Sequence, residues 1–200
     1  MSTEMLPPVL QRMKSLGFAV FEDGVYNLNL FGIRNVARTS NEFDDLIGCA
    51  YKKESGGPWV VRFWRATTDP GTYWLTNPMN VAGTAILVGN KQYRSCWRIA
   101  KHRGKYDALC QRKPVQVYRD SNKDVILDLD PDSTTEGLYG INIHASSQTH
   151  DSQQVNRYSA GCQVHGTESG FSDMMRLARL QKEHHPTWNS YTYSLLEQWW

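Results

Sequence analysis

Residues 138–165 read LYGINIHASSQTHDSQQVNRYSAGCQVH and place two strand-like runs on either side of a polar loop. The first run ends at His144, and the second begins at Cys162. Because side chains alternate along a strand, Asn142 and His144 share one face of the first run while isoleucines occupy the other. Gly161 allows the backbone to turn tightly just before the cysteine. The pattern therefore predicts two neighbouring strands that present a histidine and a cysteine to a cleft.

A histidine and a cysteine in this setting favour nucleophilic catalysis. A thiol attacks a carbonyl as its thiolate, and an imidazole can take the proton. Backbone N–H groups of the turn before the cysteine are suited to bind an oxyanion, and a loop carbonyl after the histidine, or Asn142, can fix its tautomer. The loop 145–157 is expected to act as a lid. The candidate catalytic residues are Cys162, His144, Gly161 and Ser159, and the candidate substrate-binding residues are Asn142, His102, Tyr106 and Gln163.

The rest of the chain predicts one domain, residues 1–200, that is mainly β with few helices (β-rich α+β). Short β runs interrupted by Gly, Pro and Asn favour an antiparallel sandwich or a curved sheet over βαβ units. Residues 1–17 contain a short helix that starts near a Pro-Pro pair and ends at a glycine. One long helix is predicted over 171–185, after the second strand-like run, capped by Ser169 or Ser172. Asp45 is predicted to be a solvated acid at a strand edge.

Composition excludes several classes of function. The net charge is +2, with 22 basic and 20 acidic side chains interspersed, so a nucleic-acid partner is not expected. No apolar run approaches the ~20 residues of a membrane span, and no apolar segment of a secretory signal is visible near the start. The four cysteines have no regular spacing, which disfavours a disulfide framework or zinc ribbon. No cofactor is expected.

The central stretch resembles the signature of the L,D-transpeptidase catalytic domain family. That signature has His-Gly, a spacer of similar length, and Ser-His-Gly-Cys followed by an aliphatic residue and Arg; here Ser159, Gly161 and Cys162 fall on its second half. The resemblance implies a β-sandwich fold. It also implies that Cys162 attacks an L,D peptide bond of a peptidoglycan stem peptide, forming a thioester, with His144 as base. The partner is then peptidoglycan, modified without a metal or other cofactor.

Three positions depart from this signature, namely Ala145, Ala160 and Val164. Because Val164 stands where arginine is expected, a bidentate clamp for a carboxylate is missing, and substrate anchoring must differ. This difference favours water over an amine as the acceptor, hence a peptidase or lysin. Together with the missing secretion signal, it fits a divergent, phage-encoded member that is made in the cytoplasm and reaches the cell wall or periplasm by another route.

Two alternatives stay open at this point. The first is a zinc hydrolase that uses His144, His150, His165 and Cys162 as ligands. If residues 160–165 form a regular strand, however, Cys162 and His165 point to opposite faces. The second is a non-enzymatic virion or cell-wall-binding protein with an idle site.

Overall fold

The computed structural model describes residues 5–200 and is mainly β, with three α-helices of which one is long. The prediction of a β-rich α+β chain with one long helix after the second strand-like run is therefore confirmed. The helices are α1 (Pro8–Ser15), α2 (Thr72–Thr76) and α3 (Glu168–His184), with a 3₁₀ turn η1 (Pro131–Ser133). The strands are β1 (Asn29–Arg34), β2 (Asp45–Lys52), β3 (Trp59–Thr67), β4 (Thr84–Leu87), β5 (Lys91–His102), β6 (Tyr106–Gln111), β7 (Val115–Asp120), β8 (Thr135–Gly137), β9 (Ile143–Ala145), β10 (Gln163–His165) and β11 (Tyr191–Glu197).

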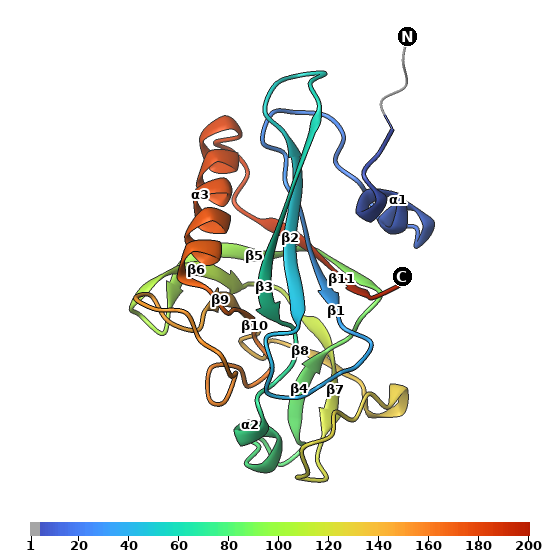
Figure 1. Cartoon of the computed structure of the whole chain (residues 1–200), viewed down its shortest axis with the longest axis vertical. Helices are drawn as coiled ribbons and strands as arrows, with labels where there is room; N and C mark the ends of the chain where they lie inside the picture. The colour runs from blue at the N-terminus through green and yellow to red at the C-terminus, as the bar shows by residue number, and fades with distance from the viewer. Residues whose placement is uncertain (1–4) are drawn as a thin grey trace.

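Eight strands close into a barrel in the order β1-β11-β5-β6-β9-β10-β3-β2, and β4, β7 and β8 form a separate sheet (Figure 1). Closure pairs every barrel strand on both sides, which removes exposed sheet edges. Two of the barrel pairings are parallel, β1 with β11 and β9 with β10. The sandwich expected from the sequence is not confirmed, because the main sheet closes on itself.

Aromatic side chains fill the barrel, and hydrogen bonds satisfy their polar atoms. Trp97 is fully buried, stands edge-on to Tyr193, and donates its indole N–H to the Ile141 carbonyl at 2.8 Å. A buried indole needs such an acceptor because an unpaired polar group in the core is costly. The same bond fixes residue 141, two residues before β9, to the barrel interior.

The long helix α3 lies along one side of the barrel and contacts β3, β6, β9 and β10 (Figure 1). Its N-cap is Thr167, whose hydroxyl accepts the Gly170 N–H, rather than Ser169 or Ser172 as predicted. Phe171, Met174 and other apolar residues of its inner face are buried. The helix therefore covers the part of the barrel in which β9 and β10 lie.

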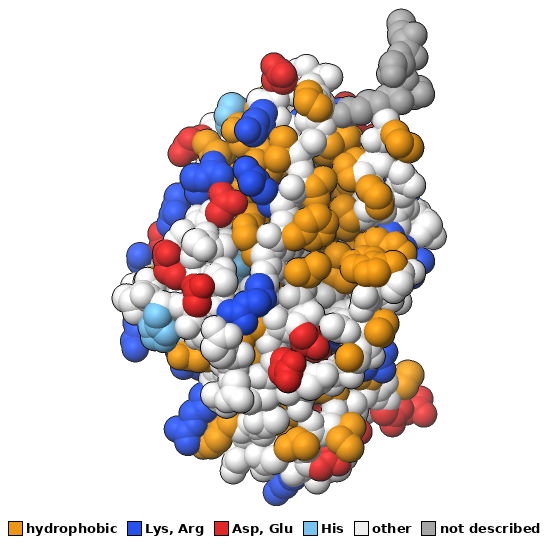
Figure 2. All heavy atoms as spheres, in the orientation of Figure 1, with side chains coloured by type: hydrophobic (Ala, Val, Ile, Leu, Met, Phe, Trp, Pro, Cys, Tyr) orange, Lys and Arg blue, Asp and Glu red, His pale blue; other side chains and the backbone are white. Residues whose placement is uncertain are grey.

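The short helix α1 covers another part of the barrel, packing Leu10 and Met13 on Phe31 and Leu196. Beside it, hydrophobic side chains gather on one face of the molecule (Figure 2). A groove of about 430 Å³ there is lined by Pro7, Pro8, Val9, Ile33, Val61, Phe63, Trp199 and Trp200. Among residues 5–200, no helix has the length and hydrophobicity needed to cross a membrane.

The barrel is least regular where the two strands of the central stretch lie. β9 and β10 have only three residues each, and β6 meets β9 at the single pair Leu109 and Ile143. Short strands leave backbone groups beyond their ends free to bind other partners. The candidate catalytic residues lie at these ends.

Candidate active site

The turn that carries Cys162, residues 159–163 (the nucleophile turn), requires glycine at position 161. Gly161 has φ +116°, and a Cβ there would lie 2.2 Å from the Ala85 carbonyl oxygen. The buried Ser159 hydroxyl accepts the Gly161 N–H at 3.2 Å and donates to the Cys162 carbonyl at 2.8 Å. Ser159 and Gly161 therefore shape the backbone that presents the cysteine.

Parallel pairing of β9 with β10 brings the segments that carry the histidine and the cysteine side by side. Val164 is paired with His144, and the Gln163 N–H donates to the Asn142 carbonyl at 2.9 Å. Cys162 directly precedes β10 and is two residues from Val164, the partner of His144.

The Cys162 side chain is half-buried, and its sulfur is held by backbone groups. Sγ accepts the Asn142 N–H at 3.4 Å and donates to the Gly140 carbonyl, also at 3.4 Å. Gly140 has φ +72°. Among the described residues, His144 is not a hydrogen-bond partner of this thiol.

His144 is buried and oriented by the carbonyl of the next residue. Its Nδ1 lies 2.8 Å from the Ala145 oxygen. A carbonyl can only accept, so Nδ1 carries the proton and Nε2 has the free lone pair of a base. The half-buried Tyr106 hydroxyl donates to the same oxygen at 3.2 Å. The carbonyl that the sequence predicts to fix the tautomer of His144 is thus that of Ala145.

His102 stacks on His144, with ring centroids 4.2 Å apart and planes 21° apart. Its Nδ1 lies 3.1 Å from the Asn142 amide nitrogen. The Asn142 oxygen accepts the Gln111 N–H at 2.9 Å, which fixes the amide so that its nitrogen faces His102. Nδ1 of His102 therefore accepts, and its Nε2 carries the proton. His102, Tyr106 and Asn142, which the sequence predicts to bind substrate, contact the His144 ring, the Ala145 carbonyl and the Cys162 sulfur, respectively.

The thiol and the imidazole are both neutral at rest. Burial raises the pKa of Cys162 to about 11, against smaller opposing effects of the Asn142 N–H and the charge of Arg103. Burial, and then the neighbouring His102, lower the pKa of His144 to about 3. The two groups therefore do not form a thiolate–imidazolium pair in this structure.

The position of Gln163 does not agree with the prediction that it binds substrate. Its side chain is fully buried on the opposite face from Cys162, where its amide nitrogen donates to the Thr68 carbonyl at 3.2 Å. Its oxygen accepts the Tyr193 hydroxyl at 3.0 Å. Gln163 therefore ties the nucleophile turn to the barrel interior and has no surface to offer a substrate.

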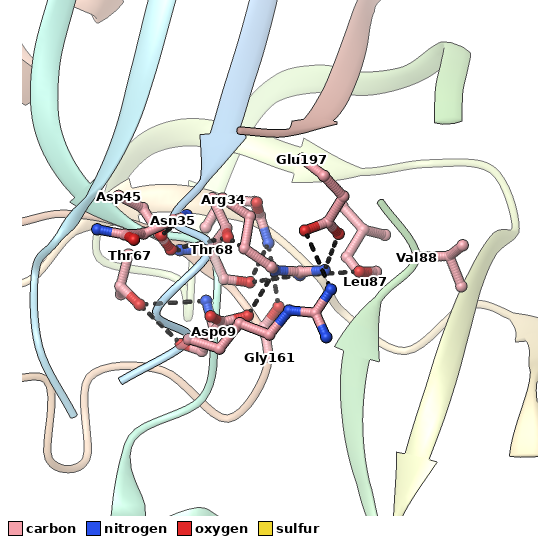
Figure 3. Close-up of polar contacts among 12 residues, drawn as sticks. Arg34, Asn35, Asp45, Thr67, Thr68, Asp69, Leu87, Val88, Gly161 and Glu197 are labelled. Carbon is pink, nitrogen blue, oxygen red and sulfur yellow. Dashed lines mark hydrogen bonds and ion pairs between the residues drawn. The ribbon is translucent and has the colours of Figure 1, made fainter. Parts of the chain in front are cut away.

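Beneath this turn lies a buried ionic group, here called the Arg34 cluster, made of Arg34, Asp45, Thr68, Asp69 and Glu197. Figure 3 shows Arg34 between Asp69 and Glu197, at 2.8 and 3.2 Å. Arg34 also donates to the Thr68 carbonyl that Gln163 uses, at 3.3 Å. The cluster thus shares an acceptor with the turn that carries the nucleophile.

The prediction of a solvated Asp45 is wrong. Asp45 is buried, and its carboxylate accepts the Asn35 N–H, the Thr68 N–H and the Thr68 hydroxyl at 2.6–2.8 Å. Arg34 itself was missed by sequence reasoning. The available signal was an arginine that ends the apolar run LFGI, where a buried charge requires partners.

His165 lies on the other face, as the strand alternation predicted. Its Nε2 is 3.2 Å from the Met174 sulfur, and its ring packs between Trp64 and Phe171. His150 is exposed and bonds Ser147. Across residues 5–200, no three His, Cys, Asp or Glu side chains are placed to hold a metal ion. The four ligands of the zinc alternative are therefore not brought together.

The loop between the two strands is anchored along its length. The Ser152 N–H donates to the Gly166 carbonyl at 2.8 Å, and the Val155 N–H to the Asn41 carbonyl at 3.0 Å. Trp74 of α2 donates its indole N–H to the Arg157 carbonyl at 3.1 Å. These bonds hold the loop against neighbouring segments, and its action as a lid stays a prediction.

The comparisons with known proteins give no family for this chain: no family model, no curated protein and no solved structure matches it.

Proposed function

We propose that this protein is a cysteine-dependent, peptidoglycan-modifying enzyme of L,D-transpeptidase type that favours hydrolysis. One observation carries the proposal: the Nδ1 proton of His144 is held by the Ala145 carbonyl at 2.8 Å, and His144 is paired with Val164, two residues after Cys162. This arrangement supports an imidazole base close to a thiol nucleophile. The closed barrel is, on this proposal, a variant of the sandwich found in the L,D-transpeptidase family.

The proposed reaction begins when the Cys162 side chain turns from the Gly140 carbonyl towards His144. Nε2 takes the thiol proton as Sγ attacks the carbonyl carbon of an L,D peptide bond. The backbone N–H of Cys162 has no hydrogen-bond partner among the described residues, which leaves it free to bind the oxyanion. The C–N bond then breaks, His144 gives the proton to the departing amine, and a thioester joins the acyl group to Sγ.

Water completes the proposed reaction. His144 takes a proton from water as the oxygen attacks the thioester, and the C–S bond breaks to release a carboxylic acid and regenerate the thiol. Val164, at the position of the family's arginine, is fully buried against Phe43 and Val155 and offers no cation to an acceptor peptide. This supports water rather than an amine as the acceptor.

The proposed substrate lies in the cell wall or periplasm. Delivery from the cytoplasm by a phage-type route completes the proposal.

Incubation with purified sacculi, followed by mass analysis of the released muropeptides, tests this function. We expect L,D-cleaved stem peptides from the native protein and from Cys110→Ala, a half-buried cysteine on β6. We expect none from Cys162→Ala, and a roughly 10²–10⁴-fold slower release from His144→Gln. If the products are instead muropeptides joined by new cross-links, the enzyme is a transpeptidase rather than a hydrolase. Unchanged sacculi that nevertheless bind the protein would establish a wall-binding protein with an idle site.

A further inference from the structure

A cavity of about 280 Å³ lies beside the nucleophile turn and contains one arginine. It is lined by Trp74, Met79, Asn80, Gly83, Thr84, Ala85, Arg119, Leu138, Tyr139 and Ala160. Apart from Arg119, these residues carry no charge at neutral pH. The cavity therefore combines one cation with apolar and aromatic walls.

The cavity adjoins the reacting sulfur on two sides. Ala160, in its wall, is two residues from Cys162. Tyr139, also in its wall, precedes Gly140, whose carbonyl accepts the thiol hydrogen at 3.4 Å. Its wall also includes Ala85, the residue against which Gly161 packs. A ligand in the cavity is therefore next to the turn that carries the nucleophile.

Arg119 is held in place by neutral groups. Its Nε donates to the Thr135 hydroxyl at 3.1 Å, and its Nη1 donates to the Gly83 carbonyl at 3.2 Å. The guanidinium carbon lies 4.3 Å from the centre of the Tyr139 ring, a cation–π contact. No carboxylate of residues 5–200 forms an ion pair with Arg119, so its charge has no counter-ion and its Nη2 has no hydrogen-bond partner within that range.

We propose that the Arg119 cavity binds a carboxylate of the acyl-donor peptide. This inference rests on the proposed function and names a substrate group for the same site. An oriented guanidinium forms charge-assisted hydrogen bonds with a carboxylate, and Tyr139 and Thr135 already fix its plane. Leu138 and Met79, both largely exposed at the cavity, offer apolar contact to the aliphatic part of such a peptide.

Binding of a matched set of peptides to the inactive Cys162→Ala protein tests the assignment. One peptide is a stem tetrapeptide with its side-chain and terminal carboxylates free, and the others carry one carboxamide each. By titration calorimetry, we expect one amidation to weaken binding roughly five- to tenfold in the Arg119-containing protein. The same amidation should have no effect in Arg119→Met, while Arg119→Lys should keep part of the difference.

The control is Arg94→Met, which removes an exposed positive charge from β5 and should keep the full acid–amide difference. A difference that persists equally in Arg119→Met overturns the assignment, as does equal binding of acid and amides to the parent. Either result leaves the proposed function standing, because the peptides still bind. If no stem peptide binds at all, the proposed function and this assignment fail together. Thermal melting of each variant separates loss of binding from loss of fold.

Discussion

The two faces of the nucleophile turn differ in charge, although both are buried. On the inner face, the Arg34 cluster surrounds a fully buried guanidinium with carboxylates at 2.8 and 3.2 Å. On the outer face, Cys162, His144 and His102 carry no formal charge at neutral pH, since burial disfavours their charged forms. The turn thus has compensated charge on its inner side and neutral titratable groups on its outer side.

Removal of Arg34 should cause the largest loss of stability among the substitutions considered. Arg34→Met leaves the buried Asp69 without its cation and Glu197 with only the exposed Arg38, and we expect a loss of about 3–5 kcal/mol in the free energy of unfolding. Urea denaturation measures it. Arg38→Met is the control, because Arg38 is exposed and only 3.7 Å from the same Glu197; it should cost under about 1 kcal/mol. Equal losses would show that the buried position of Arg34 does not matter.

Acid should destabilise the protein through its histidines. Burial lowers the pKa values of His144 and His165 to about 3, below the 6.5 of an unfolded chain. Between these values the unfolded state binds more protons, so stability is complete above about pH 6.5 and is lost as the pH falls. At pH 5 each histidine should cost about 2 kcal/mol. His165→Asn should reduce the slope of stability against pH by about 1.4 kcal/mol per unit, and an unchanged slope would contradict this account.

Two glycine substitutions separate the cost of a steric clash from the cost of a positive φ on the outer side of the nucleophile turn. Gly161→Ala meets the Ala85 carbonyl oxygen at 2.2 Å and also has a positive φ, whereas Gly140→Ala has only the positive φ, with no atom within 4 Å. We expect a loss of about 1–3 kcal/mol and of muropeptide release for Gly161→Ala. Gly140→Ala should cost about 1–2 kcal/mol. Thermal melts and the sacculus assay distinguish them, and a better tolerated Gly161→Ala would contradict the packing described here.

Tyr106→Phe should have the smallest effect. It removes one hydroxyl from the Ala145 carbonyl, while His144 keeps its own bond to that oxygen. We expect a loss of about 0.5–1.5 kcal/mol in stability and a less than tenfold decrease in muropeptide release. A decrease as large as that of His144→Gln would instead place Tyr106 among the groups that react.

Local patterns predicted much of this architecture. The short first helix, the long α3 and the separation of Cys162 from His165 all follow from periodicity within a few residues. That same alternation places Gln163 opposite Cys162, but it does not tell which face of the strand is buried. Barrel closure was not predicted, because it depends on the pairing of β1 with β11, about 160 residues away. The partners of Arg34 and the contacts of Arg119 depend on similarly distant segments.

The position of β11 has a consequence for how the chain is made. This last strand fills the gap between β1 and β5, so the barrel cannot close until residue 197 has left the ribosome. Until then β1 and β5 each expose an unpaired edge, and such edges favour aggregation. Folding should consequently be slow, as long-range β pairing requires, and dependent on chaperones during synthesis.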